Sequence, residues 1–194
     1  MRKGPRQARS RATIDAILDA AARILGERGW AAFTTNAAAE AAGVSIGSLY
    51  QYFPNKLALV EAVRQRHLNE VLAVLHAAAD GRNTRRHRVE ALIDGMIAVH
   101  SRYPAAYRVL LEESPRGEDS RGMHDFFETE CRKAYEAIFK VNARRATDAR
   151  IGAQVLAGAS AGAVHEAARQ GTLASPTLRE ELIVLVESYL SGSE

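Results

Sequence analysis

Residues 34–56 read TTNAAAEAAGVSIGSLYQYFPNK, and this stretch decides the fold. Alanine dominates its first half, which predicts a short helix over residues 36–42. Thr35 is expected to cap this helix, because its hydroxyl can accept a hydrogen bond from an amide of the first turn. Gly43 is expected to end it, since glycine adopts the left-handed backbone conformation that a tight turn between helices requires.

A second short helix is predicted to begin at Ile46, with Ser45 as its cap. At about 100° per residue, Leu49 and Phe53 lie on one side of this helix, where they are expected to pack. The opposite side is free for recognition. It comprises Gly47, Ser48, Gln51 and Tyr52, with Ile46 and Tyr50 along the boundary.

The free side of the second helix suits contact with the major groove of DNA. Its first turn combines a small hydroxyl, a bare glycine backbone and Ile46, which can approach base edges and thymine methyl groups closely. The amide of Gln51 can bond adenine. Tyr50, Tyr52 and Lys56 are of the types that contact phosphates. An ordinary helical hairpin with exposed aromatic residues is the alternative interpretation.

The segment from Thr13 to Leu59 resembles the DNA-binding domain of the tetracycline-repressor (TetR) family. One departure is Ala38, where the family usually has a large aliphatic residue, so the first short helix is expected to pack more loosely or to have Phe33 fill the gap. The resemblance rests on Ile17-Leu18-x-Ala20-Ala21, Leu25-x-x-x-Gly29, Thr34-Thr35, Ala42-Gly43-Val44-Ser45-x-Gly47-x-Leu49-Tyr50-x-Tyr52-Phe53 and Lys56.

The resemblance implies an all-α regulator. An N-terminal three-helix helix-turn-helix domain would be joined through a long helix to a C-terminal domain that binds a ligand and dimerises. We expect the DNA-binding domain over residues 1–56, with the helix-turn-helix at about 35–53, and the C-terminal domain over 57–194. The residues expected to bind DNA are Arg9, Arg11, Thr34, Thr35, Asn36, Ser45, Ile46, Gly47, Ser48, Tyr50, Gln51, Tyr52 and Lys56.

Positive charge is concentrated towards the N-terminus. Residues 1–66 hold 10 Lys and Arg against 5 Asp and Glu, whereas the remainder holds 16 against 18. The net charge of +3 at pH 7 therefore combines a basic N-terminal part with a slightly acidic remainder. Five basic residues precede any acidic one, which predicts a flexible basic arm over residues 1–11 that is drawn to phosphates. They are Arg2, Lys3, Arg6, Arg9 and Arg11.

Composition indicates a cytoplasmic protein with a substantial core. The chain has 194 residues, of which 47% are hydrophobic. It has no apolar segment of the kind found in a secretory signal or a membrane span. Cys131 is the only cysteine, which excludes an intramolecular disulfide and a cysteine-based zinc site. It lies on the apolar helical face Met123-x-x-x-Phe127-x-x-x-Cys131, so a core thiol is favoured over a redox sensor.

The rest of the chain follows helical patterns, without an alternating strand pattern or an internal repeat. A long amphipathic helix is predicted over residues 55–79, with Val60, Val63, Val71 and Val74 or Leu75 on one stripe. Further helices are predicted over about 84–102, from Pro104, over about 120–143, over about 147–170 and from Ser175-Pro176, with loops at 114–120 and 171–176.

The last two predicted helices form a candidate association surface. Small residues crowd positions 151–164, which allows another helix to approach closely, and the final helix supplies an apolar ridge. Packing within one subunit explains the small residues equally well. The resemblance favours a homodimer, since regulators of this family pair through their last two long helices. The expected interface residues are Gly158, Gly162, Leu182, Leu185, Val186 and Tyr189.

Two patterns resemble enzyme motifs, but their context does not fit. Gly158-Ala159-Ser160-Ala161-Gly162 matches the Gly-x-Ser-x-Gly motif of serine hydrolases, which needs a strand before the serine, whereas this serine lies in a helical pattern. His165-Glu166-Ala167-Ala168-Arg169 begins like a zincin helix but has arginine where the second histidine ligand must be. We therefore expect no catalytic site, metal or cofactor.

A small-molecule pocket is implied mainly by the resemblance. Histidine and aromatic residues in the core-forming helices indicate an apolar cavity with a few hydrogen-bonding points, although each residue alone fits an ordinary core position. Such a cavity favours a neutral or weakly polar effector. The expected pocket residues are His67, His100, Tyr103, Tyr107, Phe127 and His165.

The expected function is transcriptional regulation. We expect a homodimeric repressor that binds double-stranded palindromic operator DNA and leaves it when a small-molecule effector binds. One alternative is a DNA-binding activator that responds to a protein partner. The other is an all-α ligand-binding or interaction protein without working DNA recognition, which the intact Tyr50, Tyr52 and Lys56 argue against.

Overall fold

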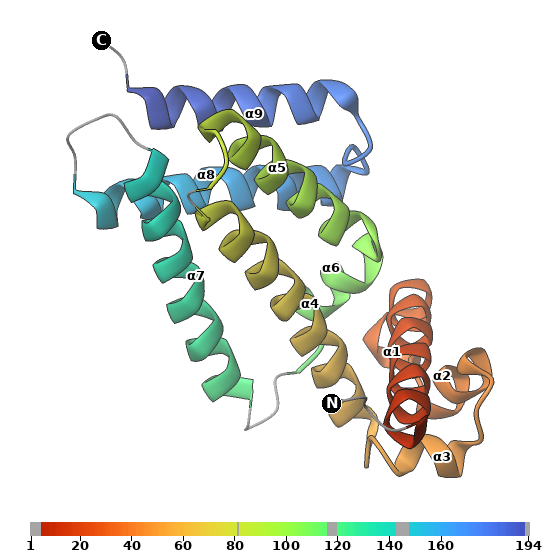
Figure 1. The fold of residues 1–194 in the computed structure, drawn as a ribbon. Coiled ribbons are helices and arrows are strands. Elements are labelled where there is room, and N and C mark those ends of the chain that lie inside the picture. The colour runs from red at the N-terminus through yellow and green to blue at the C-terminus, as the bar shows by residue number, and fades with distance from the viewer. Residues whose placement is uncertain (1–4, 81, 116–119, 143–147, 193–194) are drawn as a thin grey trace. The chain divides into compact units, whose positions relative to one another are not determined.

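The computed structural model describes residues 5–80, 82–115, 120–142 and 148–192. Within these ranges the regular structure consists of nine α-helices and no strand, which confirms the predicted all-α fold (Figure 1). No helix of the described part has the length and apolar character needed to cross a membrane. The helices are α1 (Pro5–Ala32), α2 (Thr35–Ala42), α3 (Ile46–Tyr50), α4 (Lys56–Ala79), α5 (Arg85–Ser101), α6 (Pro104–Glu112), α7 (Ser120–Asn142), α8 (Ala149–Gln170) and α9 (Pro176–Ser191).

Side-chain capping hydrogen bonds set the start of several helices. Thr84 accepts a hydrogen bond from the amide of His87 at 3.3 Å and begins α5, and Asp148 accepts from the amide of Arg150 at 2.8 Å and begins α8. Ser175 caps α9 in the same way. The predicted long helices therefore agree with the structure to within two residues at each end. The predicted loop at 114–120 falls partly outside the described residues, at 116–119.

The chain divides into two compact units. Unit 1 contains the described residues of 1–66 and 103–121, and unit 2 contains those of 67–102 and 122–194. Helix α4 is continuous from one unit into the other. The domain boundary expected near residue 56 stays a prediction, because a compact unit is not by itself a functional domain.

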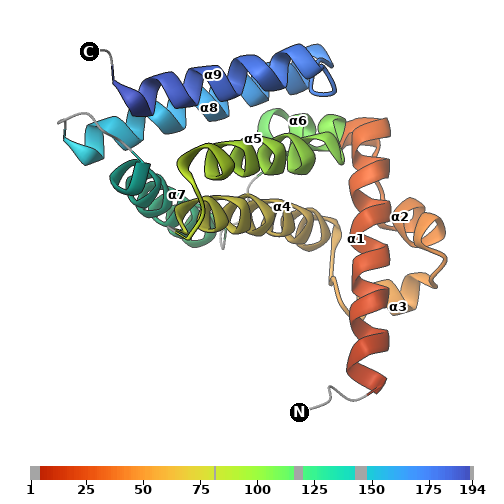
Figure 2. The same ribbon diagram turned by 45° about the horizontal axis from the view of Figure 1, so that its top comes forward.

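Unit 1 has one hydrophobic core, built by α1, α2, α3, the first part of α4 and α6. In both views α2 and α3 lie beside α1 (Figures 1 and 2). Ala38 of α2 and Phe33 are both buried in this core. Helix α2 therefore packs into the same cluster as Phe33, although residue 38 is small. The largest fully buried side chains are Ile17, Leu25, Phe33, Leu49 and Leu59.

Arg64 joins α4 to α6 inside unit 1. Its guanidinium donates to the carbonyl oxygen of Leu110 at 2.8 Å and to the hydroxyl of Ser114 at 2.6 Å. The side chain is buried, so these hydrogen bonds satisfy donors that water cannot reach. Helix α6 also contributes Ala106 and Leu110 to the hydrophobic core of unit 1.

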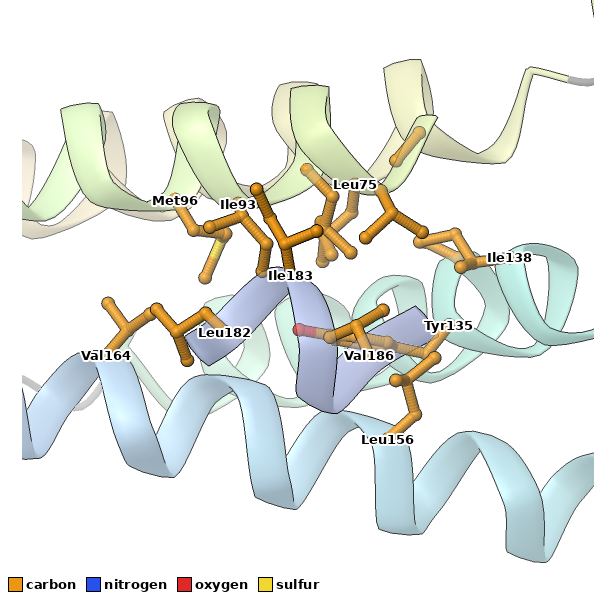
Figure 3. Packing of buried hydrophobic residues seen from close by; sticks show 14 of the residues in the cluster. Leu75, Ile93, Met96, Tyr135, Ile138, Leu156, Val164, Leu182, Ile183 and Val186 are labelled. Atoms are coloured by element: carbon orange, nitrogen blue, oxygen red, sulfur yellow. The ribbon is translucent and has the colours of Figure 1, made fainter. Parts of the chain in front are cut away.

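Unit 2 has a separate core between the second part of α4, α5, α7, α8 and α9. Figure 3 shows Leu75, Ile93 and Met96 facing Leu182 and Ile183 of α9. The same cluster includes Tyr135, Ile138, Leu156, Val164 and Val186, which are also labelled in Figure 3.

The serine of the hydrolase-like motif belongs to this core. Ser160 is buried in the middle of α8, donates to the carbonyl oxygen of Leu156 at 2.7 Å and lies 3.1 Å from the hydroxyl of Tyr135. It lies inside a helix that begins at Ala149, and not directly after a strand, so the nucleophile-elbow interpretation is excluded. Cys131 packs against the same core, and burial raises the pKa of its thiol to about 12. A thiol with that pKa is neutral at pH 7, as expected of a core residue.

The predicted stripe along α4 serves both cores. Val60 and Val63 are buried in the core of unit 1, whereas Val71 and Leu75 are buried in the core of unit 2. One helix therefore carries a single apolar stripe whose two parts stabilise different packing units.

Candidate nucleic-acid interface

Helix α2 begins one residue earlier than expected. Thr34, not Thr35, is its cap: Thr34 has an extended backbone and its hydroxyl accepts from the amide of Ala37 at 3.2 Å. The prediction that Thr35 caps this helix is therefore wrong. Thr35 is instead buried, and its hydroxyl lies 3.0 Å from that of Tyr50. Either threonine could have capped the helix, and the packing of Thr35 against α3 fixes the choice.

The turn between α2 and α3 has the predicted chemistry. Gly43 adopts φ 68° and ψ 29°, in the left-handed region that favours glycine, and its amide donates to the carbonyl oxygen of Glu40 at 3.1 Å. The hydroxyl of Ser45 accepts from the amide of Ser48 at 3.1 Å and so caps α3. These contacts fix the direction in which α3 leaves the turn.

Helix α3 is divided into a buried and an exposed side, as predicted. Leu49 is fully buried and Phe53 is 8% exposed, and both belong to the core of unit 1. The side available to a partner is headed by Ile46, which is 36% exposed, and Tyr50, which is 48% exposed. Gly47 and Gln51 are also exposed, whereas Ser48 and Tyr52 are half-buried.

Like Tyr50, the other two residues of phosphate-binding type are held by partners that the sequence did not reveal. The hydroxyl of Tyr52 accepts from Ser10 of α1 at 3.3 Å. The ammonium of Lys56 donates to the carbonyl oxygen of Trp30 at 2.6 Å and lies 4.1 Å from the centroid of the Trp30 ring. These partners are 42 and 26 residues away along the chain, and no motif connects them. Thr34 and Asn36, at the start of α2, are exposed.

The predicted flexible arm is helical from Pro5 onward. Arg9 and Arg11 are exposed on the first turns of α1, where the hydroxyl of Thr13 donates to the carbonyl oxygen of Arg9 at 2.9 Å. Proline is tolerated at the first helical position, and arginine, glutamine and alanine are good helix formers. The expectation of a flexible arm over 1–11 is therefore wrong for this part, while Arg2 and Lys3 lie outside the described residues.

Three of the expected pocket residues meet in unit 2. The ring centroids of His67 in α4 and His100 in α5 are 5.0 Å apart, and those of His100 and His165 in α8 are 5.1 Å apart. We call these residues the histidine cluster. His100 is buried and its Nδ1 lies 2.8 Å from the carbonyl oxygen of Met96. Phe127 packs against the core of unit 2.

Burial governs the protonation of the histidine cluster. It lowers the pKa of His67 to about 3, with the nearby imidazoles of His100 and His165 adding to the effect. Burial also lowers the pKa of His100. His165 is an exposed residue of α8, and the partial burial of its ring lowers its pKa as well. The three rings are therefore uncharged at pH 7. In the described ranges, no group of three His, Cys, Asp or Glu residues could hold a metal ion.

The other two expected pocket residues belong to unit 1. Tyr107 is buried in the core of that unit, and Tyr103 packs against the same core. A pocket that includes these residues together with the histidine cluster stays a prediction.

The expected dimer residues lie at different depths in unit 2. Gly158 and Gly162 are exposed and Leu185 is 43% exposed. Leu182 and Val186 are instead core residues, and Tyr189 packs against the ring of Phe139. Leu182 and Val186 therefore cannot contact a partner subunit directly and can only pack beneath the residues that do. Other exposed apolar residues of these two helices are Ile151 and Val155 of α8 and Val184 of α9.

Two family models match the chain. The model for bacterial regulatory proteins of the tetR family matches residues 17–63. The model for a tetracyclin repressor-like C-terminal domain matches residues 86–190, which is more than half of the chain.

Curated relatives match over different lengths. The nucleoid occlusion factor SlmA of Actinobacillus pleuropneumoniae is 32% identical over 49% of this chain and 47% of its own length. The transcriptional activator FasR of Mycolicibacterium smegmatis is 31% identical over 50% of this chain and 44% of its own. The chain thus spans about half the length of these relatives. The regulator BetI of Rhizobium meliloti is 27% identical over 91% of this chain and 87% of its own.

Solved structures share the fold. The fatty acid degradation regulator FadR from Bacillus halodurans has a TM-score of 0.71 and 18% identity, over 90% of this chain and 97% of that one. The complex of SmeT with triclosan has a TM-score of 0.69 and 21% identity, over 92% and 90%. SmeT represses a multidrug efflux pump of Stenotrophomonas maltophilia.

Proposed function

Because this chain belongs to the TetR family of bacterial regulatory proteins, we propose that it binds a palindromic operator as a homodimer and releases it when a small molecule binds unit 2. It is a DNA-binding transcription regulator and not an enzyme. The dimer, the repressor action, the release by an effector and a cytoplasmic location are the parts that we propose.

The exposed side of α3 carries the proposal for operator recognition. Ile46 and Gly47 lead the helix and Gln51 follows one turn later, while the buried Leu49 fixes the helix on its other side. A rigid, capped helix with small and polar groups at its start is suited to reading base edges in the major groove. Tyr50, Tyr52 and Lys56 then lie where the chain leaves the groove, and they would contact phosphates.

The exposed residues of α8 and α9 support the proposed dimer. These helices lie side by side in both views (Figures 1 and 2). Ile151, Val155, Gly158 and Gly162 follow one another at helical spacing along α8, and each is exposed. A side chain added at Gly158 or Gly162 would meet no atom within 4 Å in the monomer, so close packing inside the subunit does not explain these glycines. A second copy of the chain would.

Effector binding is supported by the chemistry of the histidine cluster. The uncharged imidazoles of half-buried His67, buried His100 and exposed His165 provide the few hydrogen-bonding points that a neutral or weakly polar ligand needs. The fold also occurs in SmeT, whose structure holds triclosan. Helix α4 begins at Lys56 and continues past His67, so a ligand that shifts His67 would act on the helix that carries the phosphate contact.

Linkage sets the condition for such release. The two DNA-binding helices of a dimer must fit successive major grooves about 34–36 Å apart, or a multiple of that distance. A small displacement of each helix can therefore cost operator contacts. The effector must bind the DNA-incompetent state more tightly, by about 1.4 kcal/mol for each tenfold loss of operator affinity, and the operator must weaken effector binding equally.

The activator alternative is kept open by FasR, which is a transcriptional activator. Binding to the DNA upstream of the protein's own gene and of its neighbours would test the proposal. We expect a defined inverted repeat to be bound, and the affinity to fall steeply with salt, because phosphate contacts release counterions. Equal affinity for scrambled DNA would overturn the proposal. A reporter gene behind the bound site then distinguishes a repressor from an activator.

Release by an effector needs its own experiment. Thermal-shift screening would identify a ligand, and its affinity would be measured with and without operator DNA. We expect the operator to weaken ligand binding by the same factor as the ligand weakens operator binding. Equal ligand affinities in the two measurements would exclude release by that compound.

A further inference from the structure

The only tryptophan of the chain holds the lysine that is expected to contact a phosphate. Trp30 lies near the end of α1 and Lys56 is the first residue of α4. The Lys56 ammonium donates to the Trp30 carbonyl oxygen at 2.6 Å and lies 4.1 Å from the centroid of the indole ring. The ring of Phe33 is 5.9 Å from the same ammonium. Backbone and side chain of Trp30 therefore both bind the same charged group.

Trp30 is fixed in turn by the residues around it. Gly29, directly before it, has φ 70°, in the region that favours glycine, and this kink aims the Trp30 amide out of the helix. That amide donates to Oε2 of Glu113 at 3.3 Å. A side chain at position 29 would place its Cβ 3.0 Å from the same oxygen. The other carboxylate oxygen of Glu113 accepts from Arg108 at 3.2 Å.

These contacts order the lysine without neutralising it. A lysine ammonium has three N–H donors. The carbonyl oxygen takes one, and the face of the indole ring attracts the positive charge without removing it. A flexible lysine would lose much conformational freedom on binding a phosphate, whereas an ammonium that is already held loses less.

We propose that Trp30 is a positioning residue for DNA binding, which holds the Lys56 ammonium where it meets a phosphate of the operator backbone. The inference rests on the proposed operator binding. It assigns to Trp30 an effect on affinity that acts through Lys56 and is independent of operator sequence.

A double-variant cycle on operator binding tests this. The affinity of the full chain for its inverted-repeat site is measured over a range of salt for Trp30→Leu, Lys56→Met and the variant with both changes. Lys56→Met should lower the affinity at least tenfold and reduce the salt slope by about two, because the homodimer loses one phosphate contact in each subunit. Trp30→Leu should lower the affinity severalfold while the slope stays, since the charge remains. The variant with both changes should bind as Lys56→Met does.

Two control variants belong to this experiment. Trp30→Phe keeps an aromatic face and the same carbonyl oxygen, and it should recover most of the affinity that Trp30→Leu loses. Lys140→Met removes an exposed lysine of α7 and should change neither affinity nor slope. Thermal unfolding confirms that each variant is folded.

Two results would overturn the inference. One is wild-type affinity in Trp30→Leu, and the other is a loss in the variant with both changes that equals the two single losses combined. If the wild-type chain binds its operator and Lys56→Met binds equally well, only this inference fails. If the wild-type chain binds no inverted repeat, the proposed function fails with it.

Fluorescence gives a test that does not depend on a Trp30 variant. Since Trp30 is the only tryptophan, the emission of the protein reports on the environment of this ring. Operator binding should change the emission of the wild-type chain and leave that of Lys56→Met nearly unchanged. An emission that does not respond to operator in the wild-type chain would contradict the proposed position of the lysine.

Discussion

The hydroxyl oxygens of Thr35 and Tyr50 lie 3.0 Å apart and join α2 to the end of α3. Thr35 is buried, whereas Tyr50 is 48% exposed. One member of the pair therefore belongs to the core of unit 1 and the other to the surface that would meet DNA. The position of an exposed tyrosine is thus fixed by a side chain that is itself buried.

Removing this hydroxyl pair should lower the stability of the folded protein. Thr35→Val and Tyr50→Phe should each lower the free energy of unfolding by about 1 kcal/mol, and both changes together should cost less than the sum, because neither hydroxyl is then left without its partner. Urea unfolding measures the free energies. Thr34→Ala is the matched control: it removes the cap of α2, also for about 1 kcal/mol, and should add fully to Tyr50→Phe.

Gln51 should determine preference among operator sequences. Its side chain is exposed at the C-cap of α3, directly after the helix, so Gln51→Ala should leave unfolding nearly unchanged and alter the ranking of operators that differ at one base pair, by about 1–3 kcal/mol. Tyr50→Ala should instead weaken binding to all of them. A competition assay over single-base variants measures both effects. An unaltered ranking in Gln51→Ala would remove its base-reading role.

Ser48 makes a less clean test of base reading. Its hydroxyl lies 2.9 Å from that of Ser45, the cap of α3. Ser48→Ala should still change the preference among operators, but it can also disturb the start of the helix.

Leucine at Gly162 should separate the subunits of the dimer without unfolding them. The monomer has open space at this position, so the cost arises only where a second helix approaches, about 1–3 kcal/mol for each copy of the residue. Sedimentation should show monomers, and operator affinity should fall. Gly122→Leu, at an exposed position of α7 with equal space, should remain dimeric. A folded, fully dimeric Gly162→Leu protein would move the interface elsewhere.

The histidine cluster should make the protein sensitive to acid. The pKa of His67 is lowered from 6.5 to about 3, so the folded state resists a proton that the unfolded state accepts below about pH 6.5. The free energy of unfolding should be unaffected above that pH. Below it, the free energy should fall by about 1.4 kcal/mol per pH unit for each histidine that stays unprotonated in the folded state. Unfolding measured between pH 7 and 4 should show the loss. His67→Leu should make this loss of stability shallower.

Local signals explain what could be predicted from the sequence. Ser45, Thr84 and Ser175 cap the helices that follow them, and the stripe of α4 is buried as expected. Such features depend on neighbours within one or two turns. Adjacent threonines at 34 and 35 could not be ranked as caps, since the choice depends on a contact with residue 50.

Contacts between distant residues explain what could not be predicted. Trp30 reaches Lys56 across 26 residues, and the histidine cluster unites three helices. In α9, Leu182 and Leu185 look alike as sequence, yet one is buried and the other is exposed, because the tertiary packing decides which apolar side of a helix is covered.

The participation of α6 in the core of unit 1 limits how regulators of this architecture can be recombined. A chimera that grafts only residues 1–66 onto another ligand domain would leave behind Ala106 and Leu110, and with them the carbonyl oxygen that satisfies the buried guanidinium of Arg64. The transplanted unit would carry an uncovered apolar face, and the Arg64 guanidinium would lose its hydrogen bonds to Leu110 and Ser114 while keeping its ion pair with Glu61. Modular exchange therefore requires two separate segments to travel together, 1–66 and 103–121, so an exchange of functional parts must cross the chain at three points instead of one.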